Sequence, residues 1–156
     1  MIRPDLFAKS LEEIDFNKLL VEGYECFLFD FDNTITAWRE KAIPERNKVI
    51  LLDLSKRALV VIVSNGKRKD VDLPVEAIWR AGKPFSLKVL RFLKKGNLKP
   101  EKCVIVGDQL FTDVLMGKLF GFYTVKVEPI SEREFVGTKF LRFLEKIVGR
   151  FSNENR

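Results

Sequence analysis

The sequence predicts an α/β fold built on a mainly parallel sheet. Short apolar runs alternate with segments of helical periodicity along most of the chain, as they do where strands are joined by crossover helices. Several of these runs are apolar at every position, which indicates strands that are buried on both faces. Neither an internal repeat nor a low-complexity linker interrupts the 156 residues, so we expect one domain over residues 1–156.

The apolar runs predict five strands flanked by helices. Pro44 suits the first turn of a helix and Gly96 suits a helix end, so each marks one boundary. We expect residues 11–20 to be helical in part and the last helix to be amphipathic. The expected strands cover residues 26–30, 58–64, 76–79, 103–107 and 123–127. The expected helices cover residues 44–57, 84–95, 112–121 and 138–151.

The composition excludes several classes of protein. Because the chain contains no histidine, it has no Ser-His-Asp or Cys-His catalytic unit, and a metal ion would need oxygen ligands. Cys26 and Cys103 lie in apolar runs, so we expect buried free thiols in a reducing compartment. No apolar run approaches the roughly 20 residues of a membrane span, and residues 1–15 lack the apolar stretch of a signal peptide. We therefore expect a cytoplasmic protein.

The net charge of +6 is unevenly distributed. Basic side chains concentrate in the second half of the chain, and between Lys83 and Lys102 the only acidic residue is Glu101. This asymmetry favours an anionic partner or substrate. The alternative interpretation is that most of these lysines cover a solvated helix face.

Polar residues follow three of the expected strands at the point where each strand ends. Asp30 and Asp32 follow the first, Ser64 and Asn65 follow the second, and Asp108 follows the fourth. The carboxyl ends of parallel strands share one edge of the sheet, which is where ligands bind in open α/β folds. Converging carboxylates repel one another unless a cation lies among them, and with no histidine present the best match is Mg²⁺. Alternatively, these aspartates only cap turns and helix ends.

Lys83 precedes a helix that we expect to begin at Pro84. A cation at a helix N-terminus opposes the helix dipole, so an anionic group should lie nearby. A phosphoryl group with its surrounding carboxylates would meet that requirement. An exposed and screened lysine is the alternative.

These residues resemble the four motifs of the haloacid dehalogenase (HAD) superfamily. Asp30-Phe31-Asp32-Asn33-Thr34 resembles the first motif, Ser64 the second, Lys83-Pro84 the third, and Gly107-Asp108 with Asp113 the fourth. The order and the spacing also agree. Val63-Ser64-Asn65 and the run from Gly107 to Val114 extend the resemblance to the YqeG-type branch of subclass IIIA, over nearly the whole chain. The resemblance implies a Rossmann-like HAD fold with a five-stranded, mainly parallel sheet.

The resemblance also implies a role for each residue. Asp30 would be the nucleophile and a Mg²⁺ ligand, and Asp32 the general acid and base that also binds Mg²⁺ through its backbone carbonyl. Asp108 would be the third protein ligand. Three residues would hold the substrate phosphate, namely Ser64, Asn65 and Lys83, and two would support the site, namely Thr34 and Asp113. The implied activity is a Mg²⁺-dependent phosphatase that forms an aspartyl-phosphate.

The intervals between the motifs predict an open site. One helix and one strand fill the segment from Asp32 to Ser64, and one helix and one strand fill the segment from Lys83 to Asp108, so no large cap domain is expected. A large substrate, or a lid contributed by a second subunit of a homo-oligomer, would fit such a site.

Three hypotheses for the function follow. The first is a phosphatase acting on phosphatidylglycerophosphate or another accessible ester, because the YqeG-type branch is related to phosphatidylglycerophosphate phosphatases. Its C-terminal helix would carry an apolar stripe from Phe140 to Phe151 among basic residues, which suits an anionic membrane surface or, alternatively, the protein's own core.

The second hypothesis is a phosphatase acting on a nucleic acid or a soluble metabolite, suggested by the basic stretch from Lys83 to Lys102. The third is a catalytically weak HAD scaffold that acts as a binding module.

Overall fold

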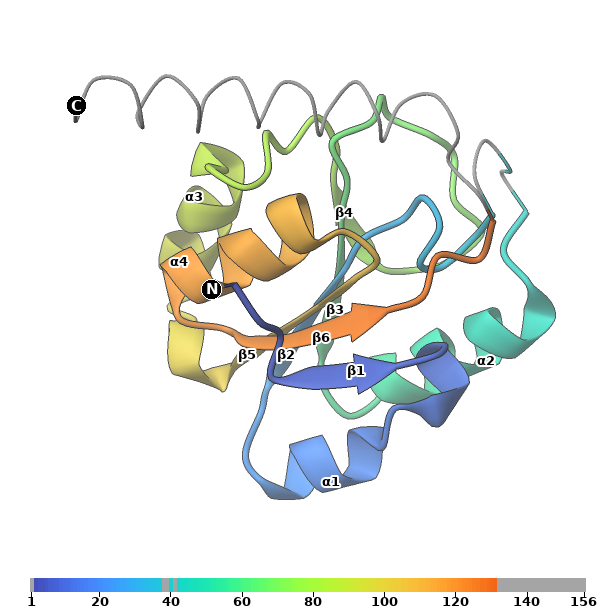
Figure 1. Ribbon diagram of the computed structural model, residues 1–156, viewed down its shortest axis with the longest axis horizontal. Helices are drawn as coiled ribbons and strands as arrows, with labels where there is room; N and C mark the ends of the chain where they lie inside the picture. Colours follow the sequence, from blue (N-terminus) through green and yellow to red (C-terminus); the bar gives the residue numbers. More distant parts are fainter. Residues whose placement is uncertain (1, 38–39, 41, 132–156) are drawn as a thin grey trace.

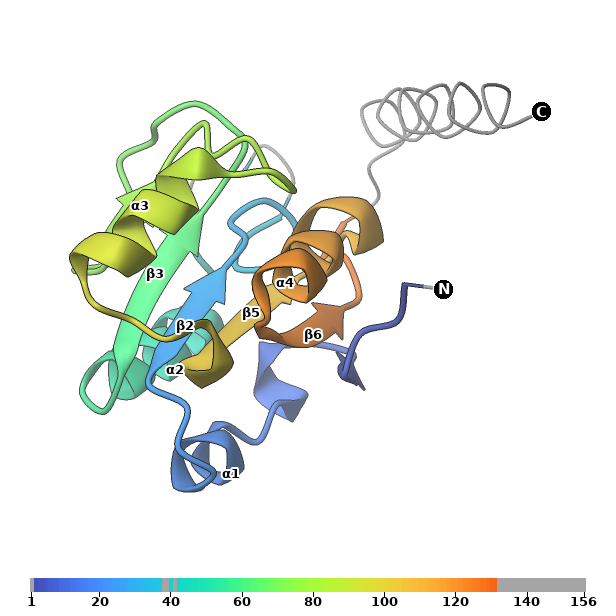
Figure 2. The same cartoon turned by 90° about the vertical axis from the view of Figure 1, so that its left-hand side faces the viewer.

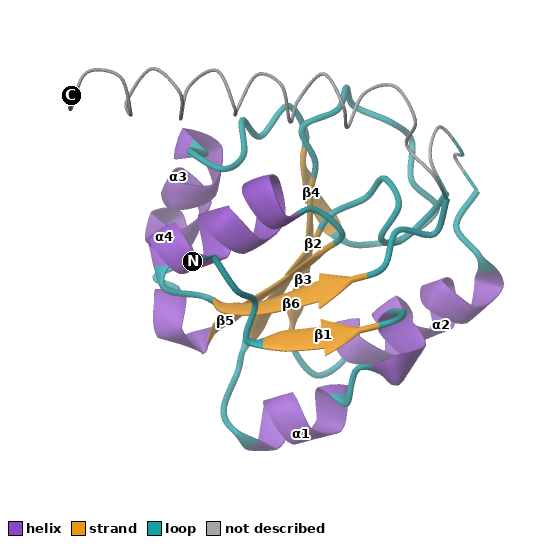
Figure 3. Ribbon diagram, in the orientation of Figure 1, coloured by secondary structure: helices purple, strands orange, loops and turns teal. Residues whose placement is uncertain are grey.

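Six strands form one parallel sheet in the computed structural model, which describes residues 2–37, 40 and 42–131 (Figures 1 and 3). The spatial order is β1-β6-β5-β2-β3-β4, and every neighbouring pair is parallel. The strands are β1 (Leu6–Ala8), β2 (Cys26–Phe29), β3 (Leu59–Val63), β4 (Glu76–Ile78), β5 (Cys103–Gly107) and β6 (Tyr123–Val127). The α/β class and the parallel sheet predicted from the sequence are confirmed.

The predicted strand count of five is wrong by one, because β1 pairs with β6 at the edge of the sheet. Asp5 explains why so short a segment pairs there. Its carboxylate accepts hydrogen bonds from the backbone N–H and the hydroxyl of Thr124, both at 2.8 Å. These long-range contacts hold the chain against β6, and a three-residue strand carries no periodic pattern that could reveal them.

The α-helices are α1 (Phe16–Val21), α2 (Glu45–Ser55), α3 (Leu87–Lys95) and α4 (Leu115–Phe120). Pro44 stands just before α2 and Gly96 just after α3, as expected. The helix expected from residue 84 begins only at Leu87, because the hydroxyl of Ser86 caps it by accepting from the N–H of Val89 at 3.1 Å. The expected helix over residues 112–121 starts as a π-helix at Leu110–Val114, and the expected helix over 138–151 lies outside the described residues.

Two apolar layers cover the sheet. On one face, α1 and α2 pack with buried phenylalanines of β2 such as Phe27 and Phe29. On the other face, α3 and α4 pack through Val89, Leu93 and Met116 (Figure 2 shows these two helices in front of the sheet and α2 behind it). Burying a side chain of this size contributes about 1.5–3 kcal/mol, so the two layers fix the sheet between them.

Cys26 and Cys103 are buried free thiols, as the apolar runs predicted. They stand opposite each other in the register of β2 and β5. These two central strands are apolar throughout and fully covered, so they fix the positions of whatever follows their carboxyl ends.

In the part of the chain that the structure describes, the segment from Asp32 to Ser64 holds α2 and β3, and the segment from Lys83 to Asp108 holds α3, a short 3-10 helix (Pro100–Lys102) and β5. The expectation that no large cap domain is inserted is therefore confirmed for those residues. None of the helices in the described ranges has both the length and the apolarity needed to cross a membrane.

Candidate active site

The sheet delivers three aspartates to its carboxyl edge. The N–H of Asp30 donates to the carbonyl of Val106 at 2.9 Å, which continues the β2–β5 pairing one residue beyond the strand. Asp108 directly follows β5. Because Phe29 and Val106 are register partners, Asp30 leaves β2 beside Gly107, and Asp108 leaves β5 one residue later on the neighbouring strand.

Asp113 completes the cluster from the π-helix that follows β5. The structure places one carboxylate oxygen each of Asp30, Asp108 and Asp113 within 4.8 Å of the others, and all three residues are buried. The hydroxyl of Thr34 donates to Asp108 at 3.4 Å. A π-helical turn is uncommon and often marks a functional site, and here it turns the side chain of Asp113 back under the strand end.

Lys83 is the counter-charge of this cluster. Its ammonium lies 3.0 Å from Oδ1 of Asp30 and 2.5 Å from Oδ1 of Asp113, and its side chain is 2 % exposed. Burial alone would lower the pKa of Lys83, but the charges of Asp113 and Asp30 outweigh that effect and raise the pKa above its ordinary value. Lys83 is therefore a permanent cation at the centre of the site.

An anionic group was expected near Lys83 because the lysine was predicted to lie at a helix N-terminus, and that prediction is wrong. The lysine does not stand at a helix N-terminus, because α3 begins at Leu87 and is capped by Ser86. The ammonium instead lies between two carboxylates that come from β2 and from the π-helix. The expectation of nearby anionic groups holds for this different reason.

The electrostatics of Asp113 fit a bound cation. Burial and the neighbouring charge of Asp30 raise the pKa of Asp113 to about 6, although Lys83 opposes the shift. Three buried carboxylates with one lysine leave a surplus of negative charge. Hard divalent cations take oxygen ligands of this kind, so the donor set suits Mg²⁺.

The composition of this cluster differs from the sequence-based expectation. The argument from residue types placed the carboxylate of Asp32 with those of Asp30 and Asp108. In the structure the third carboxylate comes from Asp113, which had been expected only to support the site. Asp32 lies two residues past Asp30, on a loop that turns its side chain elsewhere.

A tight loop after Asp30 sets the direction of Asp32. The carbonyl of Phe31 accepts from the N–H groups of Ile35 and Thr36, and Asn33 has a positive φ of 62°. Asparagine tolerates this left-handed conformation better than most residues. Asn33 also accepts hydrogen bonds from the N–H and the hydroxyl of Ser131, which ties the loop to the segment after β6.

Lys69 is a residue of this site that the sequence analysis missed. Its ammonium donates to Oδ1 of Asp32 at 3.1 Å and lies 5.2 Å from the ring centroid of Phe31. The side chains of Lys69 and Asp32 are 24 % and 12 % exposed, so the pair is largely shielded from water. The available signal was the basic run Lys67-Arg68-Lys69 just past a strand end. Its sequence does not show which of the three turns inward.

Ser64 lies at the end of β3, on the same edge. Its hydroxyl accepts from the N–H of Gly66 at 3.0 Å. A Cβ added to Gly66 would lie 3.3 Å from the Ser64 oxygen and 3.5 Å from Oδ2 of Asp32. Ser64, Gly66 and Asp32 are thus immediate neighbours, and a side chain at position 66 would crowd the space between them.

Asn65 contacts the backbone of Lys83 from both sides. Its side-chain carbonyl accepts from the N–H of Lys83 at 2.7 Å, and its amide donates to the carbonyl of Lys83 at 3.1 Å. This double contact fixes the backbone from which the lysine reaches the carboxylates. The expected contact of Asn65 with a phosphate remains a prediction.

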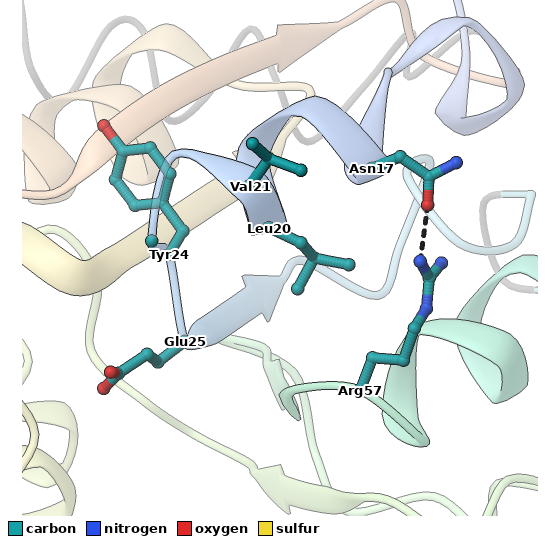
Figure 4. A pocket seen from close by; sticks show the side chains of 7 residues that line it. Asn17, Leu20, Val21, Tyr24, Glu25 and Arg57 are labelled. Carbon is teal, nitrogen blue, oxygen red and sulfur yellow. Dashed lines mark hydrogen bonds between the residues drawn. The ribbon is translucent and has the colours of Figure 1, made fainter.

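A surface pocket lies at the opposite edge of the sheet (Figure 4). Glu25 and Arg57 stand just ahead of β2 and β3, and Arg57 donates to the side-chain oxygen of Asn17. The remaining lining residues are Leu20, Val21, Gly23 and Tyr24. Because parallel strands run away from this edge, the pocket is remote from the aspartates and does not belong to their site.

Comparisons with known proteins agree with this geometry. Residues 80–129 match the family described as HAD-hydrolase-like. The probable phosphatase YqeG of Bacillus subtilis is 32 % identical over 151 residues, which cover 93 % of this chain and 88 % of YqeG. The chloroplastic/mitochondrial phosphatidylglycerophosphate phosphatase 1 of Arabidopsis thaliana is 26 % identical over 148 residues, which cover 85 % of this chain and 42 % of that protein.

Proposed function

Because this chain belongs to the HAD-like hydrolases, in the family of the probable phosphatase YqeG, we propose that it is a Mg²⁺-dependent phosphomonoesterase that works through an aspartyl-phosphate. The chain is a phosphatase of this family. What we propose is its cofactor, its reaction intermediate and its substrate. The observation that carries it is the buried cluster of Asp30, Asp108 and Asp113 around the ammonium of Lys83.

Asp30 and Asp108 are the residues that would hold Mg²⁺, together with the backbone carbonyl of Asp32, while Asp113 supports the cluster. Bound Mg²⁺ would neutralise the charge of the phosphoryl oxygens and of the carboxylates. Phosphoryl transfer depends mainly on such positioning and charge neutralisation, which suits a site without histidine.

Asp30 attacks phosphorus, and the bond from phosphorus to the leaving oxygen breaks as Asp32 gives that oxygen a proton. In the second half of the reaction, Asp32 takes a proton from water. The oxygen of that water attacks phosphorus, and the bond from phosphorus to the Asp30 oxygen breaks. Inorganic phosphate is released and the carboxylate of Asp30 is restored. Lys83 and Ser64 hold the phosphoryl oxygens, Asn65 fixes the backbone of Lys83, and Thr34 orients Asp108.

A phosphate-release assay tests this proposal. With Mg²⁺ the protein is expected to hydrolyse phosphate monoesters, with EDTA it is not, and Asp30→Asn is expected to lower kcat by at least about a thousandfold because the nucleophile is lost. Full activity of Asp30→Asn would show that another group attacks phosphorus. Undetectable hydrolysis across lipid, nucleotide and sugar phosphates would favour a HAD scaffold that acts as a binding module.

The favoured substrate is a lipid phosphate, with phosphatidylglycerophosphate as the first candidate. One similar protein carries that activity in its name, and the described residues include no inserted lid that would exclude a large or membrane-bound ester. Under this proposal the protein is cytoplasmic and peripheral to an anionic membrane. A homo-oligomer in which a second subunit covers the site is compatible with the same open edge.

A nucleic acid or a soluble metabolite is the second candidate substrate. The observation in its favour is the basic run along α3 and the following loop, from Lys88 to Lys102. Binding of single-stranded nucleic acid that weakens steeply with salt would support it, and no binding at low salt would exclude the nucleic acid.

A further inference from the structure

The end of the loop between β4 and α3 and the first turns of α3 expose apolar side chains beside the site. Phe85 is 72 % exposed, Leu87 is 65 % exposed and Leu90 is 44 % exposed. The N–H of Phe85 donates to the carbonyl of Gly82 at 3.1 Å, which closes a turn around Lys83 and Pro84. Lys83 is directed into the carboxylate cluster by this turn, while Phe85, two residues later, is left in solvent.

Elsewhere in the described chain, the large exposed apolar side chains are single, one on each of four elements and Ile130 in the segment after β6. Phe7 lies on β1, Val21 on α1, Val49 on α2 and Leu119 on α4. Isolated apolar residues of this kind are ordinary on a protein surface. Three exposed apolar side chains within six residues, next to a catalytic lysine, are not an ordinary surface feature.

The exposed face of α3 combines these apolar residues with cations. Leu87 and Leu90 share a helix face with Arg91 and Lys94, because spacings of three, four and seven residues bring side chains to one side of a helix. The opposite face carries Val89 and Leu93, which are buried against the sheet. No acidic residue occurs from Phe85 to Pro100.

We propose that Phe85 and the exposed face of α3 (Leu87, Leu90, Arg91 and Lys94) form a docking surface for an anionic lipid bilayer. The apolar residues enter the interface between headgroups and acyl chains, and the two cations contact anionic headgroups. Nucleic acid would use the cations, but it would gain little from three aliphatic or phenyl side chains grouped at one end of the helix. The proposal rests on the proposed function in its lipid form and explains how a buried phosphate site reaches an ester held in a membrane.

The placement of this surface fits its purpose. Lys83 and Phe85 belong to one turn, so a bilayer that accepts Phe85 lies close to the carboxylate cluster that Lys83 contacts. A protruding headgroup phosphate can then reach Lys83 without the lipid leaving the membrane. The lack of an inserted lid in the described chain leaves this approach open.

Vesicle binding tests the surface directly. The full-length protein is expected to sediment with vesicles of phosphatidylcholine mixed with phosphatidylglycerol, and less with phosphatidylcholine alone. Leu87→Ser with Leu90→Ser is expected to weaken binding by at least about tenfold, since each leucine loses its apolar burial. Arg91→Gln with Lys94→Gln is expected to weaken binding by a similar factor, and only for anionic vesicles. Phe85→Ser tests, in the same vesicle assay, whether the turn before α3 contributes to binding.

Val21→Ser is the matched control, because Val21 is 88 % exposed but lies at the opposite edge of the sheet (Figure 4). It should bind vesicles as the wild type does. The surface is refuted if the α3 variants bind as well as the control, or if the wild type binds single-stranded RNA but no anionic vesicle.

Activity separates failure of this surface from failure of the proposed function. The measured quantity is the ratio of phosphate release from phosphatidylglycerophosphate in vesicles to that from soluble p-nitrophenyl phosphate. This ratio should fall at least about tenfold in the α3 variants and stay at the wild-type value in Val21→Ser. A wild type that binds vesicles but hydrolyses neither substrate would overturn the proposed function, while binding alone still decides the surface.

Discussion

The ammonium of Lys69 lies 3.1 Å from Oδ1 of Asp32 and covers the ring of Phe31. Two elements meet in this contact, the loop after β2 and the loop after β3. The carboxylate of Asp32 makes this contact and is not part of the cluster of Asp30, Asp108 and Asp113. Under the proposed function, this separation leaves Asp32 to transfer protons while Asp30 and Asp108 hold the cation.

We expect Lys69 to position Asp32 rather than to contact the reacting phosphorus. Lys69→Gln should then lower kcat most for alkyl phosphates, whose leaving oxygen needs a proton, by about 10- to 100-fold. For p-nitrophenyl phosphate, whose leaving group needs little protonation, the loss should stay below about threefold. Steady-state kinetics on both substrates measures the difference.

Lys69→Arg serves as the control, because it keeps the charge and should restore much of the activity toward alkyl phosphates. An equal loss on both substrates would point to a purely structural role for Lys69.

Removing Lys83 should destabilise the protein in the absence of metal. Lys83→Met leaves Asp30 and Asp113 buried without their cation, which typically costs about 3–5 kcal/mol. The free energy of unfolding in urea with EDTA measures this loss, and Mg²⁺ should stabilise the variant more than the wild type. Adding Asp113→Asn should recover part of the loss, since it removes one of the two charges.

Lys118→Met is the matched control, because that lysine also pairs with an aspartate, Asp5, but on the surface. Exposed pairs contribute about 1 kcal/mol or less, so this variant should unfold nearly as the wild type does. Equal losses from the two variants would show that the buried charges are not what Lys83 stabilises.

Gly107→Ala should impair the metal response. A Cβ at this position would lie 2.2 Å from Cγ of Asp113, so the Asp113 side chain must move out of the cluster. We expect the Mg²⁺ concentration for half-maximal activity to rise by about 10- to 100-fold, as it does when the support of a metal site is lost. A Mg²⁺ titration of phosphate release measures the shift.

Gly117→Ala provides the comparison for that experiment. Its Cβ would lie 2.3 Å from Cγ2 of Thr124 and 2.5 Å from Cγ2 of Ile105, away from the carboxylates. It should cost about 1–3 kcal/mol of stability through overpacking, without changing the Mg²⁺ dependence. Should both variants shift the Mg²⁺ titration alike, general destabilisation would be the explanation.

Asp5 should contribute stability only where it is ionised. Burial raises its pKa, but hydrogen bonds from Lys118 and Thr124 outweigh burial and lower the pKa below its ordinary value of 3.8. Because the pKa of Asp5 is lower in the folded state, its full contribution to stability is present at a pH above its pKa in the unfolded chain. This contribution is lost as the pH falls through the pKa of Asp5 in the folded state. Asp5→Asn should therefore lower Tm near neutral pH and differ less from the wild type at about pH 3.

Thermal unfolding of both proteins across that range measures the effect. A difference in Tm that stays constant down to about pH 3 would show that the hydrogen-bond geometry, rather than the charge of Asp5, anchors β1.

The sequence predicted most of the sheet because β2, β3 and β5 are apolar at every position and needed no partner to be recognised. The predicted boundaries agree less well with the structure. Ser86 caps α3 two residues after Pro84, so the proline belongs to the preceding turn and not to the helix. β1 was missed because its pairing depends on Asp5 and Thr124, which are 119 residues apart.

By itself, the sequence determined the central strands, the aspartates that follow them and the absence of histidine, because these depend on residue type and on local pattern. Only the tertiary structure decided which carboxylates meet. A π-helical turn brings Asp113 into the cluster, and a loop after β3 brings Lys69 to Asp32. Charges attract or repel according to distance in space, and that distance is set by the packing of strands and loops that lie far apart in the chain.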